Sequence, residues 1–188
     1  MAKEHLKTMK VLLVFSGILF AVQGCPPIIS RSQWSTRASK CTQALSTSLR
    51  YAVIHHTEGN RCFSMSACKK QLRNIQYYHM VTRGWCDIGY NFLIGEDGNI
   101  YEGRGWTKMG AHTRGYNHIS LGISIMGNFM SVAPNSQALN AARSLIQCAA
   151  SRGYLSSSYI LKGHRQLGST ECPGNKLYNI IKTWPRWS

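Results

Sequence analysis

The sequence predicts a single α/β (α+β) domain, with about three helices flanking a central mixed β-sheet and disulfides bracing it. Short β-prone runs alternate with longer runs of helical spacing from Tyr51 to Trp184. The 188 residues contain no internal repeat, low-complexity tract or interdomain linker. Seven cysteines add a covalent framework. These observations favour one ordinary domain with a buried core.

The N-terminus has the features of a secretory signal peptide. Three lysines among the first ten residues precede the largely apolar run Val11–Val22, and small residues up to Gly24 suit a cleavage site. The run is too short to span a bilayer, so cleavage is favoured over a retained signal anchor. We expect a signal peptide at 1–24, a secreted extracellular product and one domain at 25–188.

The first half of that domain contains an irregular segment, a strand and a helix. Cys25–Leu49 is rich in Ser, Thr and Pro, which predicts irregular structure tied down by cysteines. Tyr51–His55 is a β-prone run typical of a buried strand. Ser66–Thr82 has apolar residues at helical spacing and basic residues elsewhere, which predicts an amphipathic helix.

A hairpin and a further strand follow in the middle of the chain. The runs Tyr90–Ile94 and Asn99–Glu102 flank the turn sequence Gly95–Gly98, and an Asp-Gly turn between two such runs predicts a β-hairpin. Leu121–Met126 is another apolar run of strand length.

The C-terminal part predicts helix, strand and helix. Asn135 can cap a helix whose apolar spacing continues to Ala149 and which ends near Gly153. Tyr159–Leu161 is a strand that leads into His164, and Lys176–Trp184 is a short final helix.

An odd number of cysteines leaves one thiol over in a secreted chain. Cys172 shortly follows His164, and His55 ends the first predicted strand. Two histidines and a cysteine leave the fourth position of a tetrahedral Zn²⁺ open, as a catalytic zinc requires. We therefore predict His55, His164 and Cys172 as zinc ligands, whereas His56 points to the opposite face of the strand. The alternative for Cys172 is a buried inert thiol or an intermolecular bridge.

Two hydroxyl groups are candidates for catalytic roles beside this metal. Tyr90 opens a hairpin strand, and its phenol could orient a water or stabilise an oxyanion. Thr170 lies two residues before Cys172 and could donate to the same oxyanion. The alternatives are a core aromatic residue for Tyr90 and a local turn bond for Thr170.

The formal net charge is +15, and the basic residues are scattered without a run of five. This pattern excludes a disordered basic tail and favours adhesion to anionic surfaces such as bacterial walls. Nothing in it predicts a specific nucleic-acid partner.

The chain from Cys25 to Ser188 resembles the short secreted peptidoglycan recognition proteins, which are related to zinc N-acetylmuramoyl-L-alanine amidases. The segments that carry the resemblance are Tyr51–Thr57, Asn74–Met80, Arg83–Gly95, Tyr101–Trp106, Gly110–His112, Gly163–His164 and Cys172–Gly174.

The resemblance implies a role for each matching residue. It implies zinc bound by His55, His164 and Cys172, with Tyr90 and Thr170 as catalytic residues. It also implies three disulfides that leave Cys172 free: Cys25–Cys148, Cys41–Cys86 and Cys62–Cys68.

A substrate groove for the muramyl sugar and the stem peptide follows from the same resemblance. The pair Gly84-Trp85 with Arg104 accompanies a preference for diaminopimelate, whose extra carboxylate an Arg can grip. The implied substrate-binding residues are His56, Thr57, His79, Arg83, Gly84, Trp85, Arg104, His112 and Asn117.

The resulting hypothesis is a secreted innate-immunity protein that binds bacterial peptidoglycan and muropeptides. It would hydrolyse the amide between N-acetylmuramic acid and L-alanine with zinc. Retention of Cys172 favours this enzyme over a non-catalytic peptidoglycan receptor or bactericidal binding protein, which is the alternative. A general cationic adhesion protein for heparan or nucleic acid is a third and weaker hypothesis. The sequence predicts no oligomeric state.

Overall fold

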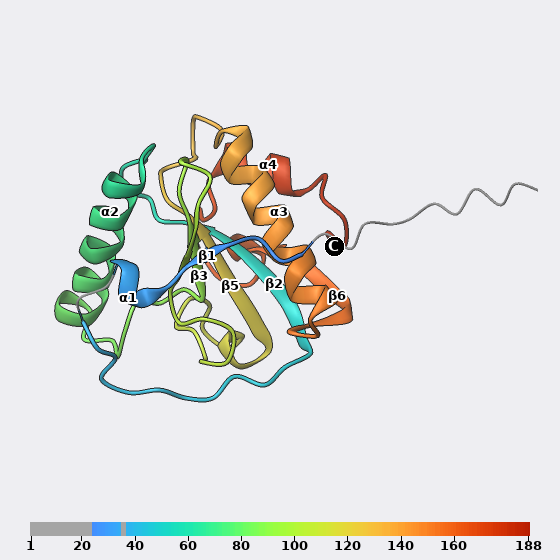
Figure 1. The fold of residues 1–188 in the computed structure, drawn as a ribbon. Helices are drawn as coiled ribbons and strands as arrows, with labels where there is room; N and C mark the ends of the chain where they lie inside the picture. The colour runs from blue at the N-terminus through green and yellow to red at the C-terminus, as the bar shows by residue number, and fades with distance from the viewer. Residues whose placement is uncertain (1–23, 35–36) are drawn as a thin grey trace, which may run out of the picture.

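The computed structural model describes residues 24–34 and 37–188, so the expected signal peptide lies outside the described residues except for Gly24. A six-stranded sheet with the order β1-β4-β3-β5-β2-β6 forms the centre (Figure 1). Its strands are β1 (Ile28–Ile29), β2 (Leu49–His56), β3 (Phe92–Ile94), β4 (Ile100–Glu102), β5 (Ser120–Ile125) and β6 (Leu155–Gly163). The hairpin pair β3–β4 is antiparallel and the other pairs are parallel, which confirms the mixed sheet.

The helices are α1 (Arg31–Trp34), α2 (Met65–Tyr77), α3 (Ser136–Ser151) and α4 (Asn175–Ile181). Short turns of 3-10 helix cover Asn117–Ile119 and His164–Gln166. The three predicted helices are confirmed as α2, α3 and α4, and the α/β class is confirmed with them. Within the described residues, no helix has the length and apolar character needed to cross a membrane.

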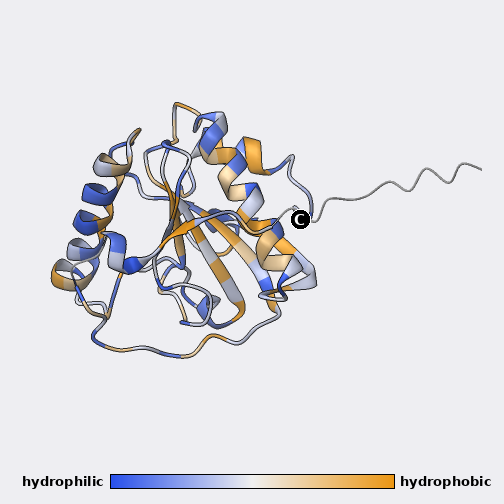
Figure 2. Ribbon diagram, viewed as in Figure 1, coloured by the Kyte–Doolittle hydropathy of each residue, from blue (hydrophilic) through white to orange (hydrophobic). Residues whose placement is uncertain are grey.

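Hydrophobic packing places helices on both faces of the sheet. On one face, Ile54 and Ile123 belong to a core cluster with Leu145 of α3 and Leu177 of α4. On the other face, Leu93 packs with Leu72 of α2 in a second, smaller cluster. Figure 2 shows hydrophobic residues along the central strands and on α3, whereas much of α2 is hydrophilic. The smaller cluster includes Leu93 of β3 and Tyr101 of β4 but no residue of β2.

The N-terminal segment departs from the prediction of irregular structure. Ile28 and Ile29 pair in parallel with Ile100 and Tyr101, which adds an edge strand to the sheet. In α1, the buried Trp34 donates from Nε1 to the Glu102 carbonyl at 2.8 Å. These elements depend on pairing with residues about seventy positions away, so no local pattern predicted them.

The predicted helix Ser66–Thr82 is divided in the structure. α2 begins after the N-cap Ser64 and continues into a π-helix at Tyr78–Thr82, where the Arg83 amide donates to the Tyr78 carbonyl. π-turns often occur at functional sites because the wider turn redirects side chains. The last predicted strand is also longer, because parallel pairing with β2 extends β6 beyond Tyr159–Leu161.

Three disulfides tie the periphery to this frame: Cys25–Cys148, Cys41–Cys86 and Cys62–Cys68. They are the pairs implied by the family resemblance, and the buried Cys172 is left as a free thiol.

Asn135 provides a test of the cap that starts α3. Its side chain accepts from the Ala138 amide and donates to the Glu96 carbonyl at 2.7 Å. Asn135→Ala should therefore lower the free energy of unfolding by about 2 kcal/mol, measured by denaturant titration. The exposed Asn140 on the same helix is the control, and Asn140→Ala should change it by less than about 0.5 kcal/mol. Equal losses in both variants would contradict the capping role.

Candidate functional site

Parallel pairing of β2 with β6 brings two predicted ligands together. Ile54 is paired with Gly163. The residues that come next, His55 and His164, therefore lie side by side at the same end of the two paired strands. Their ring centroids are 4.6 Å apart. Cys172 comes from the loop after β6, and its Sγ accepts from the His56 amide at 3.4 Å.

The ligand atoms of His55, His164 and Cys172 all lie within 4.8 Å of one another. Cys172 Sγ is 3.6 Å from His55 Nδ1. Tetrahedral Zn²⁺ with bonds of roughly 2.0 Å to nitrogen and 2.3 Å to sulfur needs ligand atoms about 3.5 Å apart. The chemistry and the spacing of these donors therefore fit zinc.

Burial determines the charge of these donors in the metal-free chain. It lowers the pKa of His55 well below the usual range, and the nearby His112 and His164 lower it further. Burial also lowers the pKa of His164 and raises the pKa of the Cys172 thiol to about 12. Two neutral imidazoles and a protonated thiol thus face one another, and a bound cation would ionise the thiol.

A groove of about 550 Å³ opens over this cluster between α2 and the edge of the sheet. Most of the predicted site residues line it: His55, His56, Thr57, His79, Arg83, Trp85, Tyr90, His112, His164, Thr170 and Cys172. The groove is lined by both polar and apolar side chains, as expected for a ligand that carries sugar and peptide.

Tyr90 and Thr170 stand beside the metal-ligand cluster. The Tyr90 ring lies 5.3 Å from the ring of His55, and burial raises the pKa of its phenol, so the hydroxyl keeps its proton and can donate. Thr170 Oγ1 accepts from the Cys172 amide at 3.2 Å, as the alternative of a local bond predicted. That bond uses a lone pair of the oxygen, so the hydroxyl proton remains available to the groove.

Aromatic and basic side chains build one wall of the groove. The Trp85 ring stacks on His79 with centroids 4.6 Å apart, and the Arg83 guanidinium lies 5.5 Å from the centre of the Trp85 ring. The π-helix presents His79, and the Gly89 amide donates to its Nδ1 at 3.0 Å.

Three predicted substrate residues lie outside the lining of the groove. Arg104 donates to the carbonyls of Ile88 and Met109 at 2.7 and 2.6 Å. Asn117 accepts from the amides of His112 and Thr113, so it shapes the loop behind the wall. Gly84 has a φ of 70° and supplies the turn before Trp85.

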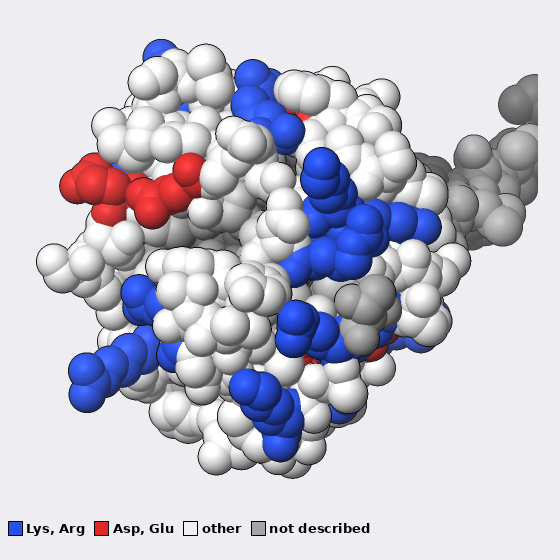
Figure 3. All heavy atoms as spheres, turned by 90° about the vertical axis from the view of Figure 1, so that its left-hand side faces the viewer, with Lys and Arg blue, Asp and Glu red and all other residues white. Residues whose placement is uncertain are grey.

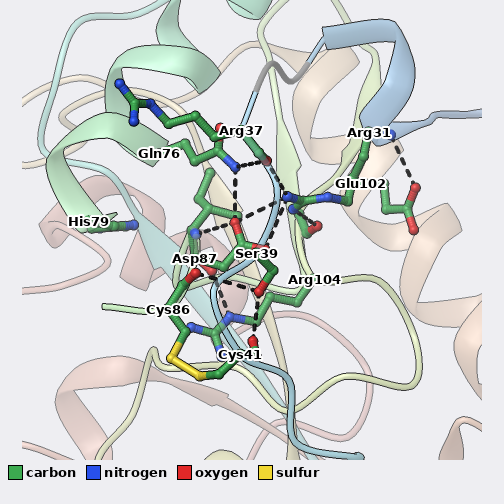
Figure 4. A network of polar contacts seen from close by, with 12 residues as sticks. Arg31, Arg37, Ser39, Cys41, Gln76, His79, Cys86, Asp87, Glu102 and Arg104 are labelled. Atoms are coloured by element: carbon green, nitrogen blue, oxygen red, sulfur yellow. Dashed lines mark hydrogen bonds and ion pairs between the residues drawn. A yellow bond between two sulfur atoms is a disulfide. The ribbon is translucent and has the colours of Figure 1, made fainter. Parts of the chain in front are cut away.

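A buried carboxylate, which the sequence analysis did not single out, holds the loop of this wall (Figure 4). Asp87 Oδ1 accepts from Gln76 Nε2 at 3.0 Å and from the Ile88 amide at 2.7 Å. Arg31 pairs with the same carboxylate at 3.1 Å and also donates to the Gly103 carbonyl. The N-terminal segment is thus fastened to the loop that carries Trp85. Asp87 lies within a segment already noted for its resemblance, but its partners are distant in sequence.

The α2 wall was also missed, although the sequence contained a pattern that identifies it. Gln71, Asn74, Ile75 and Tyr78 line the groove. Their spacing is that of a single helical face. Glu58 lines the groove too, and its carboxylate lies 3.6 Å from His56 Nε2.

Charge is distributed unevenly around this side of the molecule. Figure 3 shows Lys and Arg in several groups on the α2 side, whereas most of the acidic atoms in view form one compact patch. The basic groups are separated rather than continuous, which is consistent with the scattered charge of the sequence.

Comparison with known proteins places this fold and site in a class. A family model described as N-acetylmuramoyl-L-alanine amidase matches residues 45–175, which include all three candidate ligands. The chain therefore belongs to the N-acetylmuramoyl-L-alanine amidase family, and the resemblance to peptidoglycan recognition proteins is confirmed.

The relatives are similar over nearly their whole length. The chain is 50% identical to peptidoglycan recognition protein 1 of Bos taurus over 188 residues, covering 100% of this chain and 98% of that protein. It is 51% identical to peptidoglycan-recognition protein SC2 of Drosophila melanogaster, covering 93% and 96%. A solved structure of peptidoglycan recognition protein-LE in complex with tracheal cytotoxin (monomeric diaminopimelic acid-type peptidoglycan) is 45% identical, with a TM-score of 0.84 and coverage of 86% and 95%.

His79 predicts how the stability of the zinc-free chain depends on pH. Burial, followed by the charges of Arg104 and Arg83, lowers its pKa from 6.5 to about 4. The unfolded chain therefore takes up a proton first as the pH falls. The stability that neutral His79 contributes is complete above pH 6.5 and is lost toward pH 4, a loss of about 3 kcal/mol.

The measurement is the free energy of unfolding of the zinc-free chain at pH 7 and pH 4. His79→Asn keeps an acceptor near the Gly89 amide but removes the titrating group. Between pH 7 and pH 4, the free energy of unfolding of this variant should fall by about 3 kcal/mol less than that of the wild type. An unchanged pH dependence in this variant would rule out His79 as the source.

Proposed function

We propose that the protein is a secreted zinc-dependent amidase that binds bacterial peptidoglycan and hydrolyses the amide between N-acetylmuramic acid and L-alanine. The observation that supports it most is the convergence of two imidazoles and one free thiol at the floor of a groove. The free thiol supports the proposal further, because the other six cysteines pair and the Cys172 sulfur lies buried beside the two histidines.

His55, His164 and Cys172 would hold the zinc, and all three line the groove. When bound, zinc supplies Lewis-acid activation of water and of the scissile carbonyl. Tyr90 keeps its proton because burial raises its pKa, so its hydroxyl can donate to the negative charge that develops on the carbonyl oxygen. Thr170, whose Oγ1 lies beside the Cys172 amide, can donate a second hydrogen bond.

The groove walls would orient the substrate. The stacked pair of Trp85 and His79, with Arg83 over it, offers flat surfaces for sugar or peptide and a cation for a stem-peptide carboxylate. Gln71 and Asn74 of α2 and Tyr78 of the π-helix also line the groove and offer hydrogen-bonding groups. His56, the last residue of β2, and Thr57, which follows the strand, also line the groove.

We assign diaminopimelate-type muropeptides as the preferred substrates. Gly84-Trp85 and Arg104 support this preference, as does the similar structure described as a complex with diaminopimelic acid-type peptidoglycan. Arg104 donates to two backbone carbonyls, so it would reach the extra carboxylate with its remaining N–H groups from behind the wall.

Secretion and wall adhesion complete the proposal. Three disulfides are expected in an oxidising compartment. Removal of residues 1–24 takes away three lysines and one glutamate, so the formal charge falls from +15 to +13, which still favours attachment to an anionic bacterial surface.

The decisive variant for hydrolysis is Cys172→Ser. It should abolish zinc binding and the zinc-dependent release of stem peptide from a diaminopimelate-type muropeptide, measured by mass spectrometry with added zinc and with a chelator. The fold and muropeptide binding should persist, because serine is close in size to cysteine. Full hydrolysis by Cys172→Ser would contradict the zinc mechanism. Tight binding without release by the wild type would indicate a non-catalytic receptor.

Arg104→Gln tests the substrate preference. It removes the positive charge, so affinity for a diaminopimelate-type muropeptide should fall on the order of tenfold, whereas affinity for a lysine-type muropeptide should change little. Arg152→Gln, at an exposed arginine that does not line the groove, is the control. Isothermal titration calorimetry with both muropeptides separates the outcomes. An equal loss for both ligands would mean that Arg104 supports only the loop.

A further inference from the structure

A chain of hydrogen-bonding groups runs from the Tyr116 carbonyl to the metal-ligand cluster. Ser120 Oγ donates to Tyr116 O at 2.7 Å, and His112 Nε2 lies 3.5 Å from Ser120 Oγ. His112 Nδ1 is 3.0 Å from His55 Nε2. The opposite nitrogen of His55, Nδ1, faces Cys172 Sγ at 3.6 Å. The chain thus ends on the candidate ligand nitrogen.

Acceptor chemistry at one end of this chain fixes every proton along it. A carbonyl can only accept, so the Ser120 hydroxyl donates its proton to the Tyr116 carbonyl. The Ser120 oxygen therefore accepts from His112 Nε2–H. A neutral imidazole carries one proton, so His112 Nδ1 is bare and accepts from His55 Nε2–H. The single proton of His55 is therefore on Nε2. The lone pair of His55 Nδ1 faces Cys172 and is available to a metal.

Thr113 strengthens the same arrangement. Its Oγ1 lies 3.0 Å from His112 Nδ1 and 3.5 Å from His55 Nε2. The hydroxyl can donate to the bare nitrogen of His112 or accept from His55 Nε2–H, and each option is compatible with the same placement of both imidazole protons.

Two glycines hold the His112 ring in a slot. A Cβ on Gly122 of β5 would lie 2.4 Å from His112 Cδ2, and a Cβ on Gly110 would approach the same atom to 2.4 Å. Both distances are far below contact, so a residue with a side chain at either position would displace the ring. Asn117 Oδ1 also accepts from the His112 amide at 2.9 Å. The slot and this backbone anchor determine which nitrogen faces His55.

We propose that His112 is a positioning residue of the metal site. With Ser120 it holds the proton of His55 on Nε2 and so directs Nδ1 to the metal. This inference deepens the proposed function, on which it rests for the identity of the metal as zinc. It gives His112, which is 8% exposed, a role other than the substrate contact expected from the resemblance.

Zinc affinity measured against a competing chelator provides the first test. His112→Phe fills the slot but has no nitrogen, so zinc should bind about 10- to 100-fold more weakly, as with loss of other groups that orient metal ligands. His112→Asn places an amide oxygen near the position of Nδ1 and should restore most of the affinity. Ser120→Ala should also weaken zinc binding, because it removes the hydroxyl that accepts from His112 Nε2–H. His118→Asn, at a nearby exposed histidine, is the control and should bind as the wild type does.

The second test reads the protons directly. Long-range ¹H–¹⁵N NMR spectra of the zinc-free wild-type chain should show both His55 and His112 protonated on Nε2. A proton on His55 Nδ1, or wild-type zinc affinity in folded His112→Phe, would overturn the proposal. If His112→Phe fails to fold, Ser120→Ala and the NMR spectra decide. None of these measurements uses hydrolysis. A wild-type protein without amidase activity would contradict the proposed function but would not affect the tests of His112.

Discussion

The parallel register between β2 and β6 is the constraint on which the rest of the site depends. It sets Ile54 against Gly163, so the next residues, His55 and His164, emerge together where both strands end. Hydrogen bonding in a parallel ladder allows little slippage when one face is buried, because a shift of one residue would turn His55 into the core. The backbone amide of His56 then donates to Cys172 Sγ, which holds the third candidate ligand beside the two histidines.

Several buried polar groups around this point have specific partners. The rings of His55 and His112 are satisfied by each other, and Asp87 is satisfied by Arg31, Gln76 and a backbone amide. Buried polar groups without partners cost several kcal/mol, so these networks restrict the groove walls to few conformations. A rigid wall would suit the proposed zinc and substrate site, where both need a fixed geometry.

Burial also leaves the site electrically neutral without a metal. It lowers the pKa values of the histidines and raises that of Cys172, so the cluster carries neither a cation nor a thiolate near neutral pH. A bound divalent ion would ionise the thiol and bring its own positive charge to the cluster. The scattered positive charge of the surface acts at longer range, on approach to an anionic wall.

The sequence by itself predicted the α/β class, the main strands and helices, and the three candidate metal ligands. Each of these is marked by residue types or spacing within a short segment of the chain. Apolar periodicity marked β2, α2 and α3, and the odd cysteine marked Cys172. Tertiary structure alone decided the edge strand β1, the Asp87 network and the place of His112 behind His55. Each of these joins residues far apart in the chain, and local patterns hold no information on which distant partners fold into contact.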